Sequence, residues 1–264
     1  MMLEYRNITH TYTGYAGDEV PALRSLNLDI AEREFVVMLG PSGCGKSTLL
    51  NMAAGFIAPT GGSVLFRGEP VRSPGRERAM VFQDAALMPW MTVAENILLA
   101  MKDQVRSGQD EVSRVLEVVG LRGFNHAMPH ELSVGMRQKT AIARSLVMGA
   151  PLLLMDEPFA SLDEQTRLRL NREVVDIWLR EQRTILFVTH SIQEALVLGT
   201  RVVLMSARPG CIVEQWELPA EHSSGLERQR ERLESPKYRR LEAEILDKME
   251  LCCPPGSECD CRCR

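Results

Sequence analysis

Long hydrophobic runs are missing from this chain of 264 residues. No stretch approaches the roughly 18–20 apolar residues that a membrane-spanning helix requires. The N-terminal sequence MMLEYRNITHTY also lacks the basic start and apolar centre of a signal peptide. We therefore expect a cytosolic chain that reaches a membrane only through a partner.

An excess of basic residues is missing too, because 35 acidic residues outnumber 31 lysines and arginines and give a net charge of −4. That balance argues against a nucleic-acid partner, for which a positive surface is expected. Apolar residues make up 45% and charged residues 25%, as in a soluble protein able to bury a core. The length allows one or two domains.

Cysteine is scarce except at the C-terminal end, where five of the seven cysteines fall within residues 251–264. The other two, Cys44 and Cys211, stand alone, so we expect no disulfide framework in a reducing compartment. The C-x-C-x-C spacing at the end is tighter than that of ordinary zinc sites. This tail has no periodicity and we expect it to be disordered, with a metal or redox role as the alternative.

Four short apolar runs each lead into a polar residue with ligating or reactive chemistry. They are residues 35–39 before Gly40, 79–82 before Gln83, 152–155 before Asp156, and 185–188 before Thr189 and His190. Fully apolar strands indicate a parallel sheet covered on both faces. Ligands of such sheets lie outside the carboxyl ends of the strands, so one site assembled from four distant stretches is predicted.

Two kinds of periodicity describe other parts of the chain. Residues 3–30 alternate polar and apolar side chains, which predicts antiparallel strands around a loop at 14–20. Apolar residues recur at helical spacing over 112–119, and a second helix is expected at 135–147. Residues 221–250 are heavily charged, and their single narrow apolar stripe indicates a helical extension.

The stretch GPSGCGKST at residues 40–48 fits G-x-x-x-x-G-K-[ST] between a predicted strand and a predicted helix. Its glycines let backbone N–H groups converge on phosphate oxygens, and the helix N-terminus adds partial positive charge. Lys46 is expected to reach the terminal phosphates and Ser47 to help hold Mg²⁺. The nucleotide contacts expected in this loop are Gly40, Pro41, Ser42, Gly43, Cys44, Gly45, Lys46, Ser47 and Thr48.

Acidic and neutral side chains at the other strand ends suit phosphate chemistry. Asp156 fits the Mg²⁺ shell, and Glu157 is placed to polarise an attacking water. His190 is expected to contact the γ-phosphate or orient the water, and Gln83 to contact the metal or the water. The catalytic residues predicted are Lys46, Glu157 and His190, and the metal ligands are Ser47, Gln83 and Asp156.

A second phosphate-binding helix terminus is predicted at Ser133 and Gly135. Ser133 begins the helix, and Gly135 removes a side chain that would obstruct a ligand. The alternative is an ordinary serine cap. One nucleotide needs one phosphate cradle, so the second indicates the nucleotide of a neighbouring subunit.

This ordered set of motifs resembles the ATP-binding subunit of ABC transporters over about residues 3–215. The resemblance implies an α/β P-loop NTPase (RecA-like) core with an N-terminal antiparallel β subdomain and an inserted α-helical subdomain. It implies an ATPase domain at 1–220, with the helical part at about 88–150, then the extension at 221–250 and the tail at 251–264.

The resemblance also assigns roles within a head-to-tail dimer, in which the signature helix of one subunit closes over ATP held by the other. It makes 40–48 the Walker A loop, Gln83 the Q-loop residue, Ser133 and Gly135 part of the signature, Asp156 and Glu157 the Walker B pair, 161–163 the D-loop and His190 the switch histidine. Tyr12 resembles the aromatic residue that stacks on adenine, and Tyr15 is the alternative.

Three stretches, 87–90, 156–159 and 206–210, resemble those of the nitrate/sulfonate/taurine importers. That likeness implies uptake of a small anion, driven by ATP with Mg²⁺, through integral-membrane permease subunits supplied by a substrate-binding protein outside the cell. The subunit would lie at the cytoplasmic face of the inner membrane. The alternatives are a soluble ABC ATPase acting on nucleic acid or ribosomes, and an ATP sensor with little turnover.

One position departs from the family pattern, because Val134 stands where the signature LSGGQ or LSGGM has its first glycine. A β-branched residue resists positive φ and crowds an approaching phosphate. We therefore expect weaker closure across the subunits and a lower turnover.

Overall fold

The computed structural model describes residues 1–14, 17–101, 108–219 and 224–252. The cysteine-rich tail beyond Cys252 and the alternative aromatic residue, Tyr15, lie outside these ranges. Within the described residues, the strands form one four-stranded and one six-stranded sheet.

The four-stranded sheet is antiparallel and has the order β2-β1-β4-β5. Its strands are β1 (Leu3–Thr13), β2 (Glu19–Ile30), β4 (Gly61–Phe66) and β5 (Glu69–Pro70). Leu3 pairs with Ile30 and Thr13 with Glu19, so the hairpin predicted from the alternating pattern is confirmed. The apolar residues of that pattern are buried, which is the reason one face of this sheet packs on the core.

The six-stranded sheet has the order β10-β9-β3-β8-β7-β6. Its strands are β3 (Phe35–Leu39), β6 (Arg78–Val81), β7 (Leu152–Asp156), β8 (Thr184–Thr189), β9 (Arg201–Met205) and β10 (Ile212–Glu217). All neighbours are parallel except the β9–β10 pair. Leu39 pairs with Thr189 and Asp156 with Val188, so the ends of β3, β7 and β8 meet at one edge as predicted.

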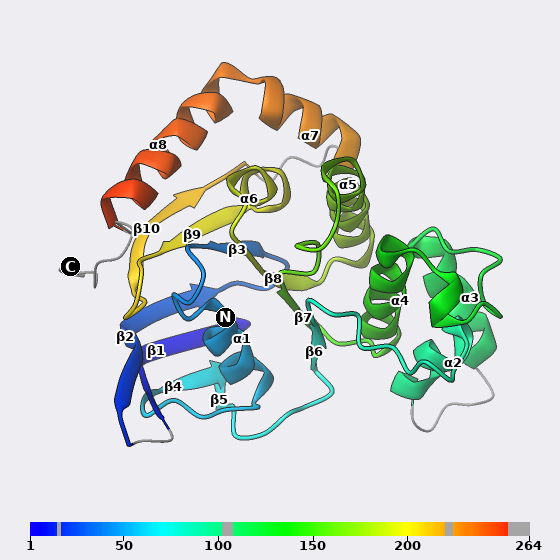
Figure 1. Cartoon of the computed structure of the whole chain (residues 1–264), viewed down its shortest axis with the longest axis horizontal. Helices are drawn as coiled ribbons and strands as arrows, with labels where there is room; N and C mark the ends of the chain where they lie inside the picture. The colour runs from blue at the N-terminus through cyan, green and yellow to red at the C-terminus, as the bar shows by residue number, and fades with distance from the viewer. Residues whose placement is uncertain (15–16, 102–107, 220–223, 253–264) are drawn as a thin grey trace.

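Helices cover both faces of the six-stranded sheet. Helix α1 (Lys46–Ala54) packs between the two sheets, where the Tyr5 hydroxyl donates to the Leu49 carbonyl at 2.9 Å. Helices α5 (Glu164–Glu181) and α6 (Ile192–Leu198) cover the other face (Figure 1). The apolar strands are therefore buried on both sides, which is what their composition predicts.

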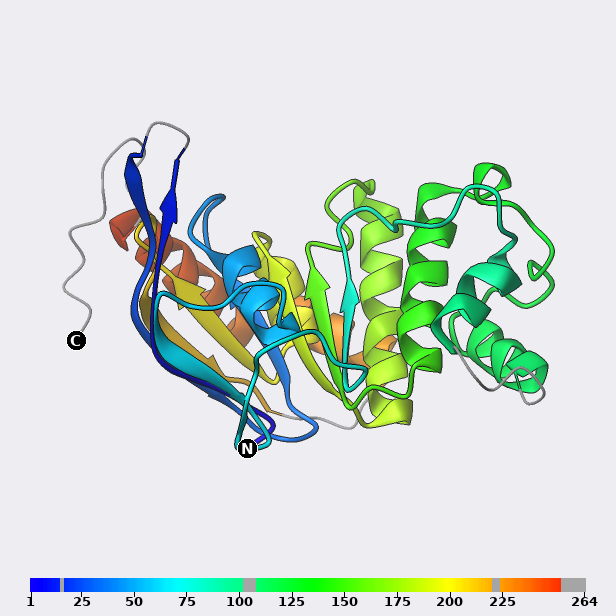
Figure 2. The same cartoon turned by 90° about the horizontal axis from the view of Figure 1, so that it is seen from below.

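Several helices lie between β6 and β7 in the sequence and form a group beside that edge of the sheet (Figure 2). They are α2 (Val93–Leu98), a 3₁₀ turn (Leu99–Met101), α3 (Gly108–Val118), a 3₁₀ turn (Pro129–Glu131) and α4 (Val134–Val147). The periodicity at 112–119 therefore marks most of α3, and α4 begins one residue before the predicted start.

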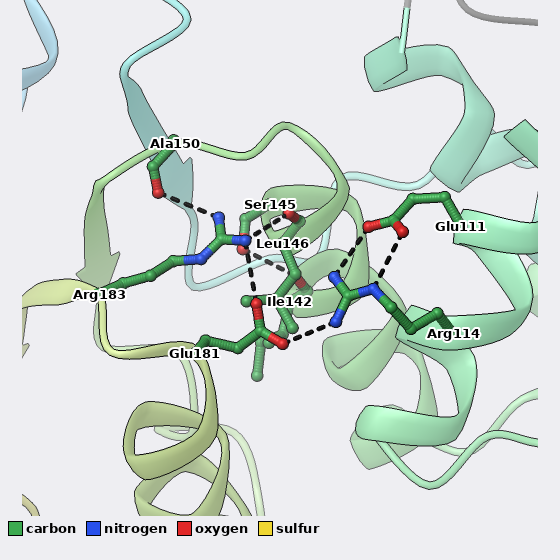
Figure 3. A network of polar contacts seen from close by, with 8 residues as sticks. All are labelled: Glu111, Arg114, Ile142, Ser145, Leu146, Ala150, Glu181 and Arg183. Atoms are coloured by element: carbon green, nitrogen blue, oxygen red, sulfur yellow. Dashed lines mark hydrogen bonds and ion pairs between the residues drawn. The ribbon is translucent and has the colours of Figure 1, made fainter. Parts of the chain in front are cut away.

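Arg114 joins this helical group to the core (Figure 3). Its guanidinium contacts both carboxylate oxygens of Glu111, one turn away on α3, and reaches Glu181 at the end of α5 at 2.7 Å. Burial alone would raise the pKa of Glu181, but hydrogen bonds and ion pairs with Arg114 and Arg183 bring it below its ordinary value. The contact fixes the outer helix α3 relative to α5.

The C-terminal helices α7 (Gly225–Glu234) and α8 (Pro236–Cys252) form an arc over α5, α6 and β10 (Figure 1). Ile245 of the predicted apolar stripe is fully buried there, and the flanking Leu241 and Met249 pack against the same core. Among the described helices, none combines the length and the apolar character needed to cross a membrane.

One expectation about cysteine is wrong. We expected both cysteines to have free thiols. Cys44 is free and buried, but Cys211 is disulfide-bonded. The position of a cysteine along the sequence does not show which thiols meet in the fold.

Candidate functional site

A cleft of about 400 Å³ opens at the carboxyl edge of the parallel strands. Its lining combines residues from β1, β2, the glycine loop, the end of β6, the end of β7 and the β9–β10 loop. They are Tyr12, Ala22, Ser42, Gly43, Gly45, Lys46, Ser47, Thr48, Gln83, Asp156, Glu157 and Arg208. Residues up to 196 positions apart in the sequence are thus brought to one place, as the four apolar runs predict.

The glycine loop has the conformation that a phosphate cradle requires. Gly43 and Gly45 have φ values of 80° and 98°, in the left-handed region that side chains disfavour. A Cβ on Gly45 would also lie 2.6 Å from Leu23 Cδ2. Helix α1 begins immediately after this turn, so its free N–H groups lie at the cleft.

Lys46 bends back onto the loop that carries it. Its ammonium group donates to the carbonyl oxygens of Gly40 and Pro41, both at 2.8 Å, and the side chain is buried. A cation held above a cradle of backbone N–H groups makes this part of the cleft suited to an anion.

Ser47 and Asp156 form the first of two polar pairs at the cleft. The Ser47 hydroxyl donates to Asp156 Oδ1 at 2.9 Å. Burial raises the pKa of Asp156, and the hydrogen bond from Ser47 partly offsets that effect. Hydroxyl, carboxylate and amide oxygens are the ligands that Mg²⁺ prefers, and Gln83 lines the same cleft, so these residues fit the ion.

No group of three or more His, Cys, Asp or Glu that could hold a metal occurs in the part of the chain that the structure describes. An ion at Asp156 would therefore also need the Ser47 hydroxyl, the Gln83 amide and oxygens from its ligand.

Glu157 and His190 form the second pair. His190 Nδ1 lies 3.0 Å from Glu157 Oε2, and the Glu157 backbone N–H donates to the Val188 carbonyl at 3.0 Å. Glu157 has φ 41°, a left-handed conformation that costs about 1–3 kcal/mol in a residue other than glycine. In this conformation the carboxylate reaches the His190 ring.

The sequence interpretation missed the residues that fix the segment around His190. The Thr189 hydroxyl donates to the Glu194 carboxylate and accepts from the Ser191 backbone N–H at 3.0 Å. Burial raises the pKa of Glu194. The S-x-x-E spacing of Ser191 and Glu194, which is typical of a helix start, was the available signal.

Ser133 caps α4, and its hydroxyl accepts from the Met136 N–H at 3.2 Å. Gly135 is buried, and a Cβ there would lie 3.3 Å from Thr166 Cγ2. The missing side chain thus allows the close approach of α5, and the predicted contact of Gly135 with a ligand stays a prediction. Neither Ser133 nor Gly135 lines the 400 Å³ cleft of the same chain.

Val134 is the first residue of α4 and is not among the residues with positive φ. The expectation of backbone strain at this position is therefore wrong, because a helical φ suits valine. Val134 is 43% exposed at the start of the helix. This exposure is what supports the expectation that its side chain would crowd an approaching phosphate.

Tyr12 lies at the cleft, where its hydroxyl is 3.1 Å from Thr48 Oγ1. Its ring meets the His10 ring edge to face, with centroids 4.5 Å apart. Tyr12 thus presents a supported aromatic ring beside the glycine loop, a surface on which a base can stack.

The comparison with known families decides the identity, because the model of the ABC transporter family matches residues 23–160. The chain belongs to the ABC transporter family. It is 41% identical to the taurine import ATP-binding protein of Jannaschia sp. over 247 residues, 92% of each chain. It is 46% identical to the nitrate import ATP-binding protein of Synechocystis sp. over 215 residues, 80% of each chain.

A solved structure agrees with this assignment. A dimeric ATP-binding cassette in a post-hydrolysis state, bound to ADP and Pi, superposes with a TM-score of 0.72 at 28% identity and covers 83% of this chain and 100% of that one. The α/β P-loop NTPase fold expected from the sequence is confirmed, and this ABC transporter subunit is an ATPase.

The ABC ATPase has one further contact that sequence reasoning missed, between α4 and the residues around Gln83. Gln138 Nε2 donates to the Phe82 carbonyl at 2.9 Å. Arg144 donates to the Ala86 and Ala85 carbonyls at 2.9 and 3.0 Å, and burial lowers its pKa. The helix that Ser133 caps therefore holds the loop that carries Gln83.

Proposed function

We propose that this ATPase powers the uptake of a small anion, of the nitrate, sulfonate or taurine type, through separate permease subunits. The observation that carries the proposal is the identity of 41–46% to taurine and nitrate import ATP-binding proteins over 80–92% of the chain. Relatives with these names do not favour an ATPase of nucleic acid or ribosomes, and neither does the net charge of −4.

ATP would bind in the cleft with its phosphates on the N–H groups of residues 40–48 and its base against Tyr12. Lys46 would exchange its two carbonyl acceptors for phosphate oxygens, a stronger, charge-assisted contact. Ser47, Gln83 and Asp156 would hold Mg²⁺, which supplies positive charge to the phosphates when bound.

Hydrolysis would depend on the Glu157–His190 pair. Glu157 would accept a proton from the attacking water, since its carboxylate already projects from the end of β7. His190 would hold that carboxylate in place through the 3.0 Å contact and face the γ-phosphate. Lys46 would stabilise the charge that develops on the transferred phosphoryl group.

A head-to-tail dimer would complete each site. Ser133 and Gly135 lie outside the cleft of their own chain, so the N-terminus of α4 is available to a nucleotide held by the partner. A dimeric cassette of the same fold supports this arrangement. Val134 would then face the partner's phosphate.

The permease subunits would contact the helical group, which we assign to about residues 88–150 of an ATPase domain at 1–220. Trp90 follows the loop of Gln83 and is 69% exposed, as a docking side chain would be. The subunit would be peripheral at the cytoplasmic face of the inner membrane, and a substrate-binding protein outside the cell would act only through the permease.

Uptake by a strain deleted for this chain tests the proposal. Wild-type protein should restore uptake of nitrate, taurine or an alkanesulfonate, whereas Glu157→Gln should not, although it should still co-purify with the permease. Glu234→Gln, an exposed change at the end of α7, is the matched control and should restore uptake fully. Failure of wild-type protein to restore uptake of any of these anions would contradict the proposed substrate class.

A further inference from the structure

Arg208 lies in the nucleotide cleft although no sequence motif assigns it a role there. It lines the cleft together with the glycine loop, and its Nη2 is 3.6 Å from the position that a Cβ on Gly43 would take. The side chain is exposed, and no other described residue gives its guanidinium a hydrogen bond or an ion pair. The cleft therefore contains an arginine whose charge is free for a ligand.

The loop that carries Arg208 is held by hydrogen bonds on both sides. The Ser206 hydroxyl donates to the Ala207 carbonyl at 3.0 Å and accepts from the Cys211 N–H at 3.0 Å. The Gly210 N–H donates to the Ala22 carbonyl at 2.8 Å. These contacts attach the β9–β10 loop to β2, next to the glycine loop.

The same loop touches the phosphate cradle directly. A Cβ on Gly210 would lie 1.9 Å from the Cys44 carbonyl oxygen, so only glycine allows the two backbones to approach this closely. Arg208, two residues earlier, is thereby set at a fixed distance from the cradle.

Charge explains what Arg208 would bind. Lys46, the other cation among the lining residues, contacts the loop at Gly40 and Pro41, while Arg208 approaches it at Gly43. Arginine presents a planar fork of donors that matches phosphate oxygens. We propose that Arg208 binds a phosphate group of the nucleotide, as a second cation in addition to Lys46.

This inference rests on the proposed binding of ATP in the cleft and adds a contact specific to the β9–β10 loop. It predicts that Arg208→Ala weakens binding of both ATP and ADP by about tenfold, the usual size of a lost charge-assisted contact. Adenosine, which has no phosphate, should bind equally well to both proteins. Arg208→Lys should lose less affinity for ATP and ADP than Arg208→Ala, because lysine keeps the positive charge but lacks the planar guanidinium donors.

Equilibrium titration of the full chain with ATP, ADP and adenosine at low and at 0.5 M salt tests the inference. The matched control is Arg122→Ala, an exposed arginine outside the cleft, which should bind like wild type. Unchanged ATP affinity of Arg208→Ala, or an equal loss for adenosine, would overturn the inference. Absence of ATP binding by wild-type protein would instead contradict the proposed function itself.

Discussion

Two side-chain pairs at adjacent strand ends divide the chemistry of the cleft. Ser47 and Asp156 present oxygen atoms beside the glycine loop, where the Asp156 carboxylate is partly buried, whereas Glu157 contacts a histidine that is 55% exposed. The first pair suits a metal ion, which would compensate the partly desolvated Asp156 carboxylate, and the second pair suits a reaction with water. Sequence reasoning could name these four residues because each follows directly on a glycine loop or an apolar strand.

The raised pKa of Asp156 leads to a prediction about stability. A carboxyl group whose pKa is higher in the folded than in the unfolded protein destabilises the fold when it is ionised. That cost is complete above the folded pKa, declines as the pH falls, and disappears below the ordinary value of 3.8. Asp156→Asn keeps the acceptor for Ser47, so it should raise the melting temperature of the nucleotide-free protein at pH 7.

Thermal unfolding by circular dichroism at pH 7 and at pH 5 measures this effect, with Asp247→Asn on α8 as the control. The rise in melting temperature of Asp156→Asn over wild type should be at least as large at pH 7 as at pH 5. A lower melting temperature of Asp156→Asn at pH 7 would show that the carboxylate stabilises the fold.

Val134 leads to a prediction about turnover. Because its backbone is helical, only its exposed side chain would hinder a partner's phosphate. Val134→Gly should therefore raise the ATPase and transport rates, by up to about a hundredfold if the obstruction misplaces the phosphate by an ångström. Val134→Ala should give an intermediate rate. Phosphate release by the assembled transporter is the measurement, and unchanged rates in both variants would show that the valine is no obstacle.

At the scale of elements, α4 connects Ser133, which caps it, with the loop of Gln83. The helix expected at 135–147 agrees with α4 to within one residue. The three hydrogen bonds from Gln138 and Arg144 to the backbone at 82–86 could not be predicted, because they join residues more than 55 positions apart. Gly135 illustrates the same limit: its neighbour Thr166 on α5 becomes visible only in the fold.

Removal of the Arg144 contact should loosen the Gln83 loop. Arg144→Ala leaves the Ala85 and Ala86 carbonyls to solvent, so the free energy of unfolding should fall by about 1–2 kcal/mol. Hydrogen exchange of residues 83–88 should become faster, while α1 keeps its protection. Arg180→Ala, an exposed change on α5, is the control, and equal exchange in all three proteins would contradict this role of Arg144.

At the scale of the whole molecule, the C-terminal arc of α7 and α8 runs over α5, α6 and β10 (Figure 1). The four apolar runs predicted the parallel sheet with helices on both faces. The order of the motifs predicted the helical insertion. The charged composition of residues 221–250 predicted a helical extension but did not indicate that Arg228 and Arg232 are buried. In the structure both are fully buried, over the rings of Trp178 and Tyr238.

Arg232 joins the arc to the core and should be needed for stability. It donates to the carbonyls of Leu196, at 2.8 Å, and Gly199, at 2.6 Å, at the end of α6. Arg232→Ala leaves these buried acceptors unpaired, so unfolding in urea should show a loss of about 2–4 kcal/mol. Arg230→Ala, on the same helix, is the control; a loss of the same size there would contradict a specific role of Arg232.

Phosphate release by the purified complex of this ATPase with its permease tests the central claim most directly. Wild-type protein should release phosphate continuously from Mg²⁺ and ATP, and Glu157→Gln should bind ATP yet release phosphate at least about a hundredfold more slowly. Glu157→Gln turning over ATP at the wild-type rate would contradict the assignment of hydrolysis to the Glu157–His190 pair.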